Sequence, residues 1–155
     1  MAISAYPILV NPSDDWVQIA ATNPAASSLN FTGISNYKKL MVFWANGTNT
    51  ITSFRFNSDS GTKYAYSSIG VSSGTPVGTY NYTTTAVQTN ADNYMRLEIE
   101  STDTSNIKKY SCEPHGSSQT YRLTGIYQAT APITSVNLVW SGTFSQTVYL
   151  YGVRA

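Results

Sequence analysis

Charged residues, cysteine and histidine are all scarce in this chain. Asp, Glu, Lys and Arg together make up 11% of its 155 residues, and there is one cysteine, Cys112, and one histidine, His115. With a single cysteine, the chain can form no internal disulfide and no multi-cysteine metal site. The net charge is +1, from nine basic and eight acidic residues. Nucleic-acid binding requires clustered positive charge, so we expect no nucleic-acid partner.

Long apolar runs are missing as well. No stretch approaches the roughly 20 apolar residues that a membrane-spanning helix needs. The first residues, Met-Ala-Ile-Ser-Ala-Tyr-Pro, lack the basic start and the apolar segment of a secretion signal. We therefore expect a protein that is made in a cytoplasm and has no membrane partner. A chain of this length suits one domain with a single core.

Aromatic residues, by contrast, are plentiful at 13%, and hydrophobic residues stand at 41%. Disordered chains have the opposite balance, with many charges and few aromatic residues. Apolar and polar residues alternate with a period of two, most clearly where Met95, Leu97 and Ile99 oppose Tyr94 and Glu98. We expect strands near 15–21, 28–34, 38–45, 50–56, 64–66, 93–102, 107–112, 121–129, 133–140 and 147–153, with a turn at 141–142 before the last.

This pattern predicts the fold class. No segment has the period of a helix of three turns, and turn signals recur about every 8–12 residues. The sequence therefore predicts an all-β, single-domain antiparallel β-sandwich, jelly-roll-like and without substantial helix, over residues 15–155.

One aromatic stretch indicates this architecture most directly. Phe54 and Phe56 lie two apart, and so do Tyr64 and Tyr66, so each pair shares one face of a strand. The residues at 57–61 between them are rich in Asn, Asp and Gly, which favour turns. The stretch predicts an antiparallel hairpin with one aromatic face buried.

Two segments look suited to contacts with a partner. Residues 1–14 contain two prolines and few periodic apolar positions, which indicates an extended N-terminal arm. Residues 70–90 are rich in Gly, Ser and Thr, and we expect a projecting β-ribbon or a loop ordered by a neighbouring subunit. The candidate partner-contact residues in these segments are Tyr6, Pro7, Pro12, Tyr80 and Tyr82.

A thiol, a carboxylate and an imidazole lie within the four residues 112–115. Catalytic nucleophiles and bases usually come from different elements, and a proline separates this pair. We interpret Cys112 as a small buried thiol followed by a surface loop. As a metal site, the stretch offers too few ligands unless subunits share it around a symmetry axis.

Other candidate sites have simpler structural explanations. Glu98 and Glu100 would lie roughly 7 Å apart on one strand face, a separation that could serve a glycosidase, but exposed carboxylate pairs are commoner. Residues 57–61 loosely resemble a calcium loop without its later carboxylates, and a turn explains them better. We expect the tryptophans to be core residues rather than a sugar-stacking platform; they are Trp16, Trp44 and Trp140. We predict no catalytic residue, no cofactor and no metal.

Four stretches carry a resemblance to a known group. They are Trp16-Val-Gln-Ile-Ala, the segment from Phe31 to Leu40, the segment Phe54-Arg-Phe-Asn-Ser-Asp-Ser-Gly-Thr-Lys-Tyr64 and the closing Val148-Tyr-Leu-Tyr-Gly-Val153. With them, the chain resembles small β-sandwich structural proteins of tailed bacteriophages, which occur as capsid decoration (cement) proteins, head fibres and tail-fibre tips.

The resemblance implies a place on the virion surface and no catalytic residue. It implies a capsid decoration protein, a homotrimer that stabilises the shell through contacts with the major capsid protein or other virion proteins. The alternative is a receptor-binding domain of a head or tail fibre, in which Tyr-rich and Ser/Thr-rich loops bind host surface glycan.

Overall fold

The computed structural model describes residues 15–45, 47, 49–72, 75–83, 94–100, 102–115 and 119–155. Over these ranges the chain forms eleven strands and no helix, which confirms the all-β prediction. The strands are β1 (Trp16–Thr22), β2 (Ala26–Thr32), β3 (Tyr37–Ala45), β4 (Ile51–Phe56), β5 (Tyr64–Ser72), β6 (Thr75–Thr83), β7 (Tyr94–Glu100), β8 (Lys108–His115), β9 (Gln119–Tyr127), β10 (Ser135–Phe144) and β11 (Val148–Arg154).

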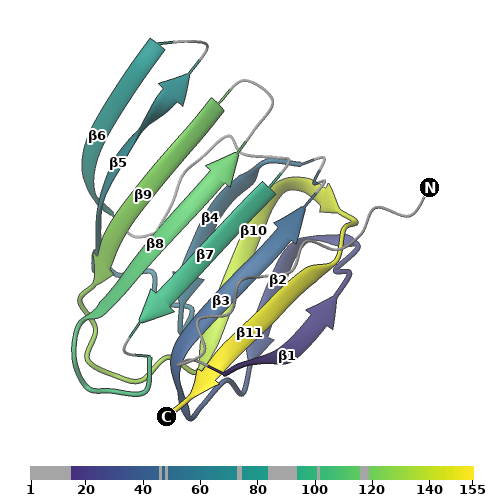
Figure 1. The fold of residues 1–155 in the computed structure, drawn as a ribbon, viewed down its shortest axis with the longest axis vertical. Coiled ribbons are helices and arrows are strands. Elements are labelled where there is room, and N and C mark those ends of the chain that lie inside the picture. The colour runs from purple at the N-terminus through teal and green to yellow at the C-terminus, as the bar shows by residue number, and fades with distance from the viewer. Residues whose placement is uncertain are drawn as a thin grey trace.

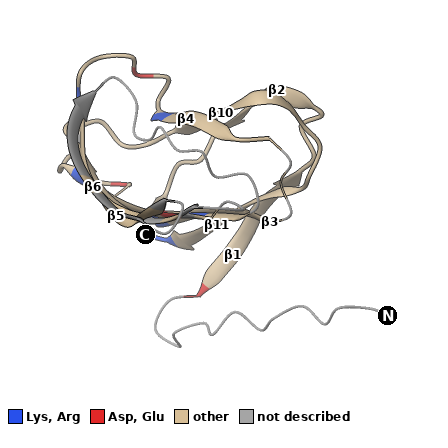
Figure 2. Cartoon of the chain, turned by 90° about the horizontal axis from the view of Figure 1, so that it is seen from above, with Lys and Arg blue, Asp and Glu red and all other residues tan. Residues whose placement is uncertain are grey.

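The strands form two antiparallel sheets of unequal size. The large sheet has eight strands in the order β1-β11-β3-β7-β8-β9-β5-β6, and the small sheet has three in the order β2-β10-β4. In Figure 1 the large sheet lies in front of the small one. Figure 2 shows the two layers edge-on. The predicted β-sandwich is confirmed.

The core lies between the two sheets and is rich in aromatic residues. At one end, the ring of Trp140 stacks on Phe144 with centroids 4.5 Å apart, and Trp44 meets both rings edge-on at 5.6 Å. At the other end, Phe56 meets Tyr127 edge-on at 5.4 Å. Aromatic pairs in such geometries add stability beyond their area burial. The core is thus closed by rings contributed from both sheets.

The hairpin predicted around residues 57–61 is wrong, because the strands on either side of it do not pair. The prediction that their aromatic residues are buried is confirmed. β4 belongs to the small sheet and β5 to the large one, so the chain crosses between the sheets instead of turning back within one. Asn57 and Ser58 adopt left-handed φ values of 54°, which turn the chain out of the sheet plane. The Phe56 N–H then donates to the hydroxyl of Tyr64 at 2.9 Å across the core.

The predicted turn at 141–142 is also wrong. β10 runs on through Ser141 and Gly142 to Phe144, with a register shift after Val139. Such an irregularity adds residues to a strand without ending it. Trp140 and Phe144 lie four residues apart, so alternation along this longer strand places both side chains in the core.

Candidate binding face

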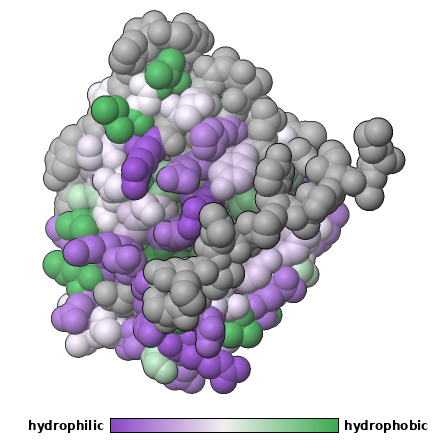
Figure 3. Space-filling view, in the orientation of Figure 1, coloured by the Kyte–Doolittle hydropathy of each residue, from purple (hydrophilic) through white to green (hydrophobic). Residues whose placement is uncertain are grey.

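The outer face of the large sheet is turned away from the small sheet, and the alternation of β7 shows why it is wet. Met95, Leu97 and Ile99 are fully buried against the core, while Tyr94 and Arg96 remain accessible on the other side. In Figure 3, which views the molecule from this side, strongly hydrophobic residues form separate patches among hydrophilic and neutral ones. Figure 2 shows few charged residues, scattered over the fold.

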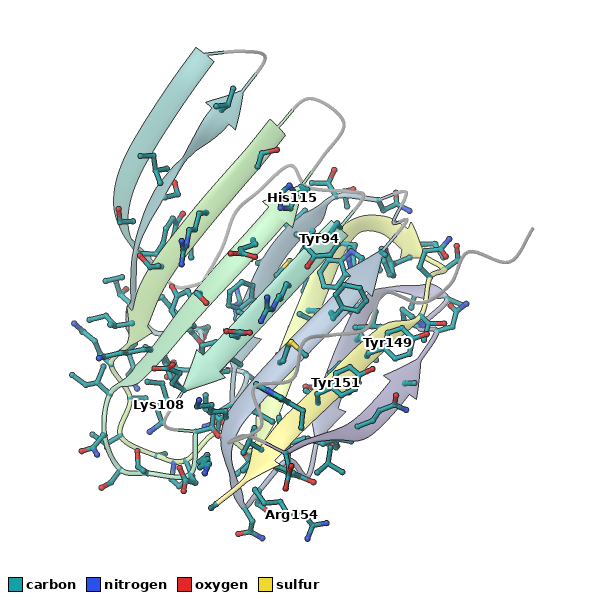
Figure 4. The ribbon with its side chains drawn as sticks, viewed as in Figure 1. Tyr94, Lys108, His115, Tyr149, Tyr151 and Arg154 are labelled. Carbon is teal, nitrogen blue, oxygen red and sulfur yellow. The ribbon has the colours of Figure 1, made fainter. Side chains whose placement is uncertain are left out.

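Five half-buried rings follow one another across this face; we call them the aromatic track. Its members are His115 on β8, Tyr94 on β7, Phe43 on β3, and Tyr149 and Tyr151 on β11. Successive centroids lie 5.3 Å apart for His115 and Tyr94, 5.4 Å for Tyr94 and Phe43, 6.2 Å for Phe43 and Tyr149, and 6.3 Å for Tyr149 and Tyr151. Figure 4 shows four of these side chains in front of the sheet.

Two tyrosine hydroxyls of the track, those of Tyr94 and Tyr151, have a raised pKa and stay protonated well above neutral pH. Partial burial raises the pKa of Tyr94, and Glu113 and Glu98 raise it further against the opposing effect of Arg96. Burial also raises the pKa of Tyr151. The Tyr151 hydroxyl donates to the Gln18 side-chain oxygen at 3.4 Å. The track therefore combines apolar ring faces with neutral hydroxyl groups.

A hollow of about 470 Å³ lies on the same sheet beside the track. Strands β5, β7, β8 and β9 contribute its walls and floor. The lining residues include Ala65, Ser67, Glu98, Glu100, Lys109, Ser111, Thr124 and Ile126. We call this feature the hollow. An ion pair between Arg96 and Glu98 joins the track side of β7 to the rim of the hollow.

The carboxylates Glu98 and Glu100 share this rim, as their spacing predicted. Glu98 is engaged by the guanidinium of Arg96 on its own strand. Glu100 lies opposite Lys109 in the register of β7 and β8. Both carboxylates thus have a cation beside them.

Cys112 and His115 lie on opposite faces of β8. Cys112 is fully buried in the core, where burial raises the pKa of its thiol. His115 lies in the aromatic track on the outer face. The structure therefore confirms the interpretation of Cys112 as a buried thiol and does not bring the two groups together. β8 also extends through residue 114 to His115, where the sequence predicted a loop.

The Asn- and Asp-rich stretch at 57–61 forms a turn, as interpreted. The Gly61 N–H donates to Asp59 Oδ1 at 2.8 Å. Lys63 forms an ion pair with Asp59 Oδ2 at 3.1 Å. Across the ranges that the structure describes, no three His, Cys, Asp or Glu side chains come together as a set of metal ligands.

Two tryptophans confirm the core interpretation and one does not. Trp44 and Trp140 are buried between the sheets. Trp16 lies on the edge strand β1 and stays partly accessible. The reason is topological, because an edge strand has a neighbour on one side only.

The predicted contact residues are only partly placed. Tyr6, Pro7 and Pro12, in the expected arm 1–14, lie outside the described residues, as do positions 84–90 of the expected ribbon. Tyr80 and Tyr82 lie on β6, opposite Ser67 and Ala65 in the register of the β5–β6 pair. Their backbone thus adjoins the strand that lines the hollow.

Sequence reasoning missed the track. Tyr149 and Tyr151 alternate with the buried residues Val148, Leu150 and Gly152, and this was a usable signal. What the sequence did not supply was the strand order that sets β11 beside β3 and β3 beside β7.

Comparisons with known proteins give little further guidance. No family model matches the chain. No curated protein matches it. Among solved structures, it is similar to the CBM2 module of the evolved Dit of Lactobacillus casei BL23 phage J-1, with 7% identity over 83% of this chain and 69% of that one. The TM-score is 0.21, which does not establish a shared fold. Within the described ranges, no helix long and apolar enough to cross a membrane is found.

Proposed function

We propose that this protein is a surface protein of a bacteriophage particle that works by binding, without catalysis, and that the aromatic track holds a host surface glycan. The observation that carries the proposal is the unbroken series of rings at 5.3–6.3 Å across four strands of an exposed sheet face.

The track has the chemistry that saccharide recognition needs. Sugar rings present an apolar face of C–H groups, which packs on the electron-rich face of an aromatic ring. Phenolic hydroxyls beside those rings can donate to and accept from sugar hydroxyls. The four strands from β8 to β11 span about 14 Å at the usual strand spacing, so an oligosaccharide could contact several rings at once.

The virion setting is supported by the resemblance of the four sequence stretches to phage β-sandwich proteins. As a homotrimer on the virion surface, the protein would present several copies of the track to one cell. Weak single-site binding then becomes strong attachment through multivalency. The trimer follows from the same resemblance and from the closed symmetry that homo-oligomers usually adopt.

A printed array of bacterial surface glycans tests the proposal. Wild-type protein should bind a subset of the glycans, and Phe43→Ala and Tyr149→Ala should each weaken binding about tenfold, equal to ~1.4 kcal/mol. Ile107→Ala, which trims an exposed residue of a turn, is the matched control and should bind like wild type. Unchanged binding in both track variants, or no glycan bound by wild type, would overturn the proposal.

Capsid decoration is a second candidate, and a different observation favours it. Ile69 is 70% and Val71 44% exposed on β5, next to the edge strand β6. Exposed apolar side chains at a sheet edge suit a protein partner such as the major capsid protein. If this candidate is correct, the protein should sediment with empty capsids and the double variant Ile69→Ser/Val71→Ser should not. Sedimentation with cells alone would rule it out.

A further inference from the structure

We infer that the hollow is a second subsite for the same saccharide and that it takes the acetamido group of an N-acetylated sugar. The inference rests on the proposed function, since it assigns a ligand group to the face that carries the track. Three features support it: an apolar floor, a row of hydroxyl groups and a balanced set of charges.

The floor of the hollow is apolar. Ala65 and Ile126 lie opposite each other in the register of β5 and β9. Ala65 is 6% exposed, yet it is not part of the core cluster between the sheets. Its methyl group therefore lies on the outer side of the sheet, where it lines the hollow. The methyl of an acetamido group has the size and chemistry to pack there.

A row of hydroxyl groups crosses the hollow. Ser111 on β8 lies opposite Thr124 on β9, and Thr124 lies opposite Ser67 on β5. At the usual strand spacing the row covers about 10 Å. Hydroxyl groups both donate and accept, so this row can satisfy the carbonyl and the N–H of an amide as well as neighbouring sugar hydroxyls.

The charges around the hollow are balanced. Glu98 is paired with Arg96, and Glu100 faces Lys109 across the β7–β8 pair. The rim therefore has no excess of positive charge to select a sugar acid. A neutral group that offers an N–H to a carboxylate and a carbonyl to a hydroxyl fits this arrangement better than an ionised one.

The hollow and the track can contact one ligand. Tyr151, Met41 and Glu98 form one row across β11, β3 and β7, because the register pairs Tyr151 with Met41 and Met41 with Glu98. The end of the track and the rim of the hollow are thus two strands apart, about 10 Å. Met41 lies between them in the same row.

Two oligosaccharides that differ only at carbon 2 test the inference by isothermal titration calorimetry. Hexamers of β-1,4-linked N-acetylglucosamine and of β-1,4-linked glucose share backbone and linkage. The N-acetylated hexamer should bind wild type about tenfold or more tightly than the glucose hexamer, which is the discrimination that one buried methyl can supply.

Thr124→Trp, which fills the hollow with an indole ring, should abolish this preference. Thr32→Trp makes the same substitution at an exposed position on the small sheet and should keep the preference. Thermal unfolding of each variant verifies the fold. Equal affinity of wild type for the two hexamers, or a preference that survives Thr124→Trp, would overturn the inference and leave the proposed function standing. Binding of neither hexamer would overturn the inference, whereas only the glycan array decides the proposed function.

Discussion

The hydroxyl of Tyr127 on β9 donates to Asp59 Oδ2 at 2.8 Å and so ties the large sheet to the crossing segment between β4 and β5. Gly61 and Lys63 hold the same carboxylate from within that segment. Burial alone would raise the pKa of Asp59, but the hydrogen bonds from Gly61 and Tyr127 and the charge of Lys63 outweigh it and lower the pKa below 3.8. The crossing between the sheets is therefore fixed by an ionised carboxylate.

The first prediction concerns acid stability. A carboxyl group whose pKa is lowered by folding stabilises the fold above its unfolded pKa, and this contribution is lost as the pH falls through the folded pKa. Asp59→Asn should lower the free energy of unfolding by about 1 kcal/mol at pH 7. The variant should then lose less stability than wild type as the pH falls below about 4. Urea unfolding at pH 7, 5 and 3 measures both effects. Asp15→Asn, at an exposed position, is the control, and identical pH profiles for Asp59→Asn and wild type would contradict the prediction.

The second prediction concerns Gly125 on β9. A Cβ atom there would overlap the ring of Tyr110 and approach the carbonyl oxygen of Ala65 to 2.7 Å. Because Tyr110 is packed in the core, Gly125→Ala should destabilise the protein by about 1–3 kcal/mol. Gly78→Ala places its Cβ at an ordinary 3.7 Å from the carbonyl of Ser68 and should change stability little. Equal midpoints of thermal unfolding for the two variants would show that Tyr110 moves aside freely.

The third prediction concerns Lys108, a lysine with no exposed surface. Its ammonium group donates to four backbone carbonyls on two loops, at 2.7 Å to Thr104 and Asn106, 3.1 Å to Thr130 and 3.3 Å to Ala129. Lys108→Met keeps the length of the side chain but leaves these carbonyls without their donor, so it should cost roughly 2–4 kcal/mol.

The neighbouring Lys109→Met supplies the control for Lys108, because the side chain of Lys109 is exposed. Guanidinium unfolding should show a clearly lower midpoint for Lys108→Met than for Lys109→Met. If the free energies of unfolding of the two variants differ by less than about 0.5 kcal/mol, water replaces the ammonium group of Lys108 without cost.

The fourth prediction concerns the thiol of Cys112. Burial raises its pKa, and the thiolate is the reactive form, so the folded protein should resist modification by a disulfide reagent at pH 8. Complete labelling should require denaturant, and the labelling rate should follow the fraction unfolded. Rapid labelling of the native protein would mean that the sheets open locally around β8.

Local sequence patterns predicted the strands well and their partners poorly. Alternation located β7 and β11 to within two residues, since burial of one strand face leaves a period of two in the sequence. The same alternation in β4 and β5 could not reveal that the two strands lie in different sheets. A turn within a sheet and a crossing between sheets use the same Asn, Asp and Gly residues, and the distinction depends on contacts such as that of Tyr127 with Asp59.

The candidate site was less predictable for a related reason. The sequence singled out Tyr80 and Tyr82 because they lie in a polar segment, whereas the track uses rings from strands that look like core. Phe43 lies in an almost continuously apolar run and still faces outward beside Tyr149. Which apolar residues of such a run face outward depends on the faces that neighbouring strands cover, and this requires the topology.

The strand order also determines how the molecule can reach its native state. β10 is the middle strand of the small sheet, between β2 and β4, and β11 lies between β1 and β3. Neither sheet is complete until β10 and β11, the last two strands in chain order, have inserted between strands that come from about the first third of the chain. Such distant pairings make folding slow and all-or-none. A nascent chain that stops before Ser135 would expose two unfilled sheet edges and would be prone to aggregate.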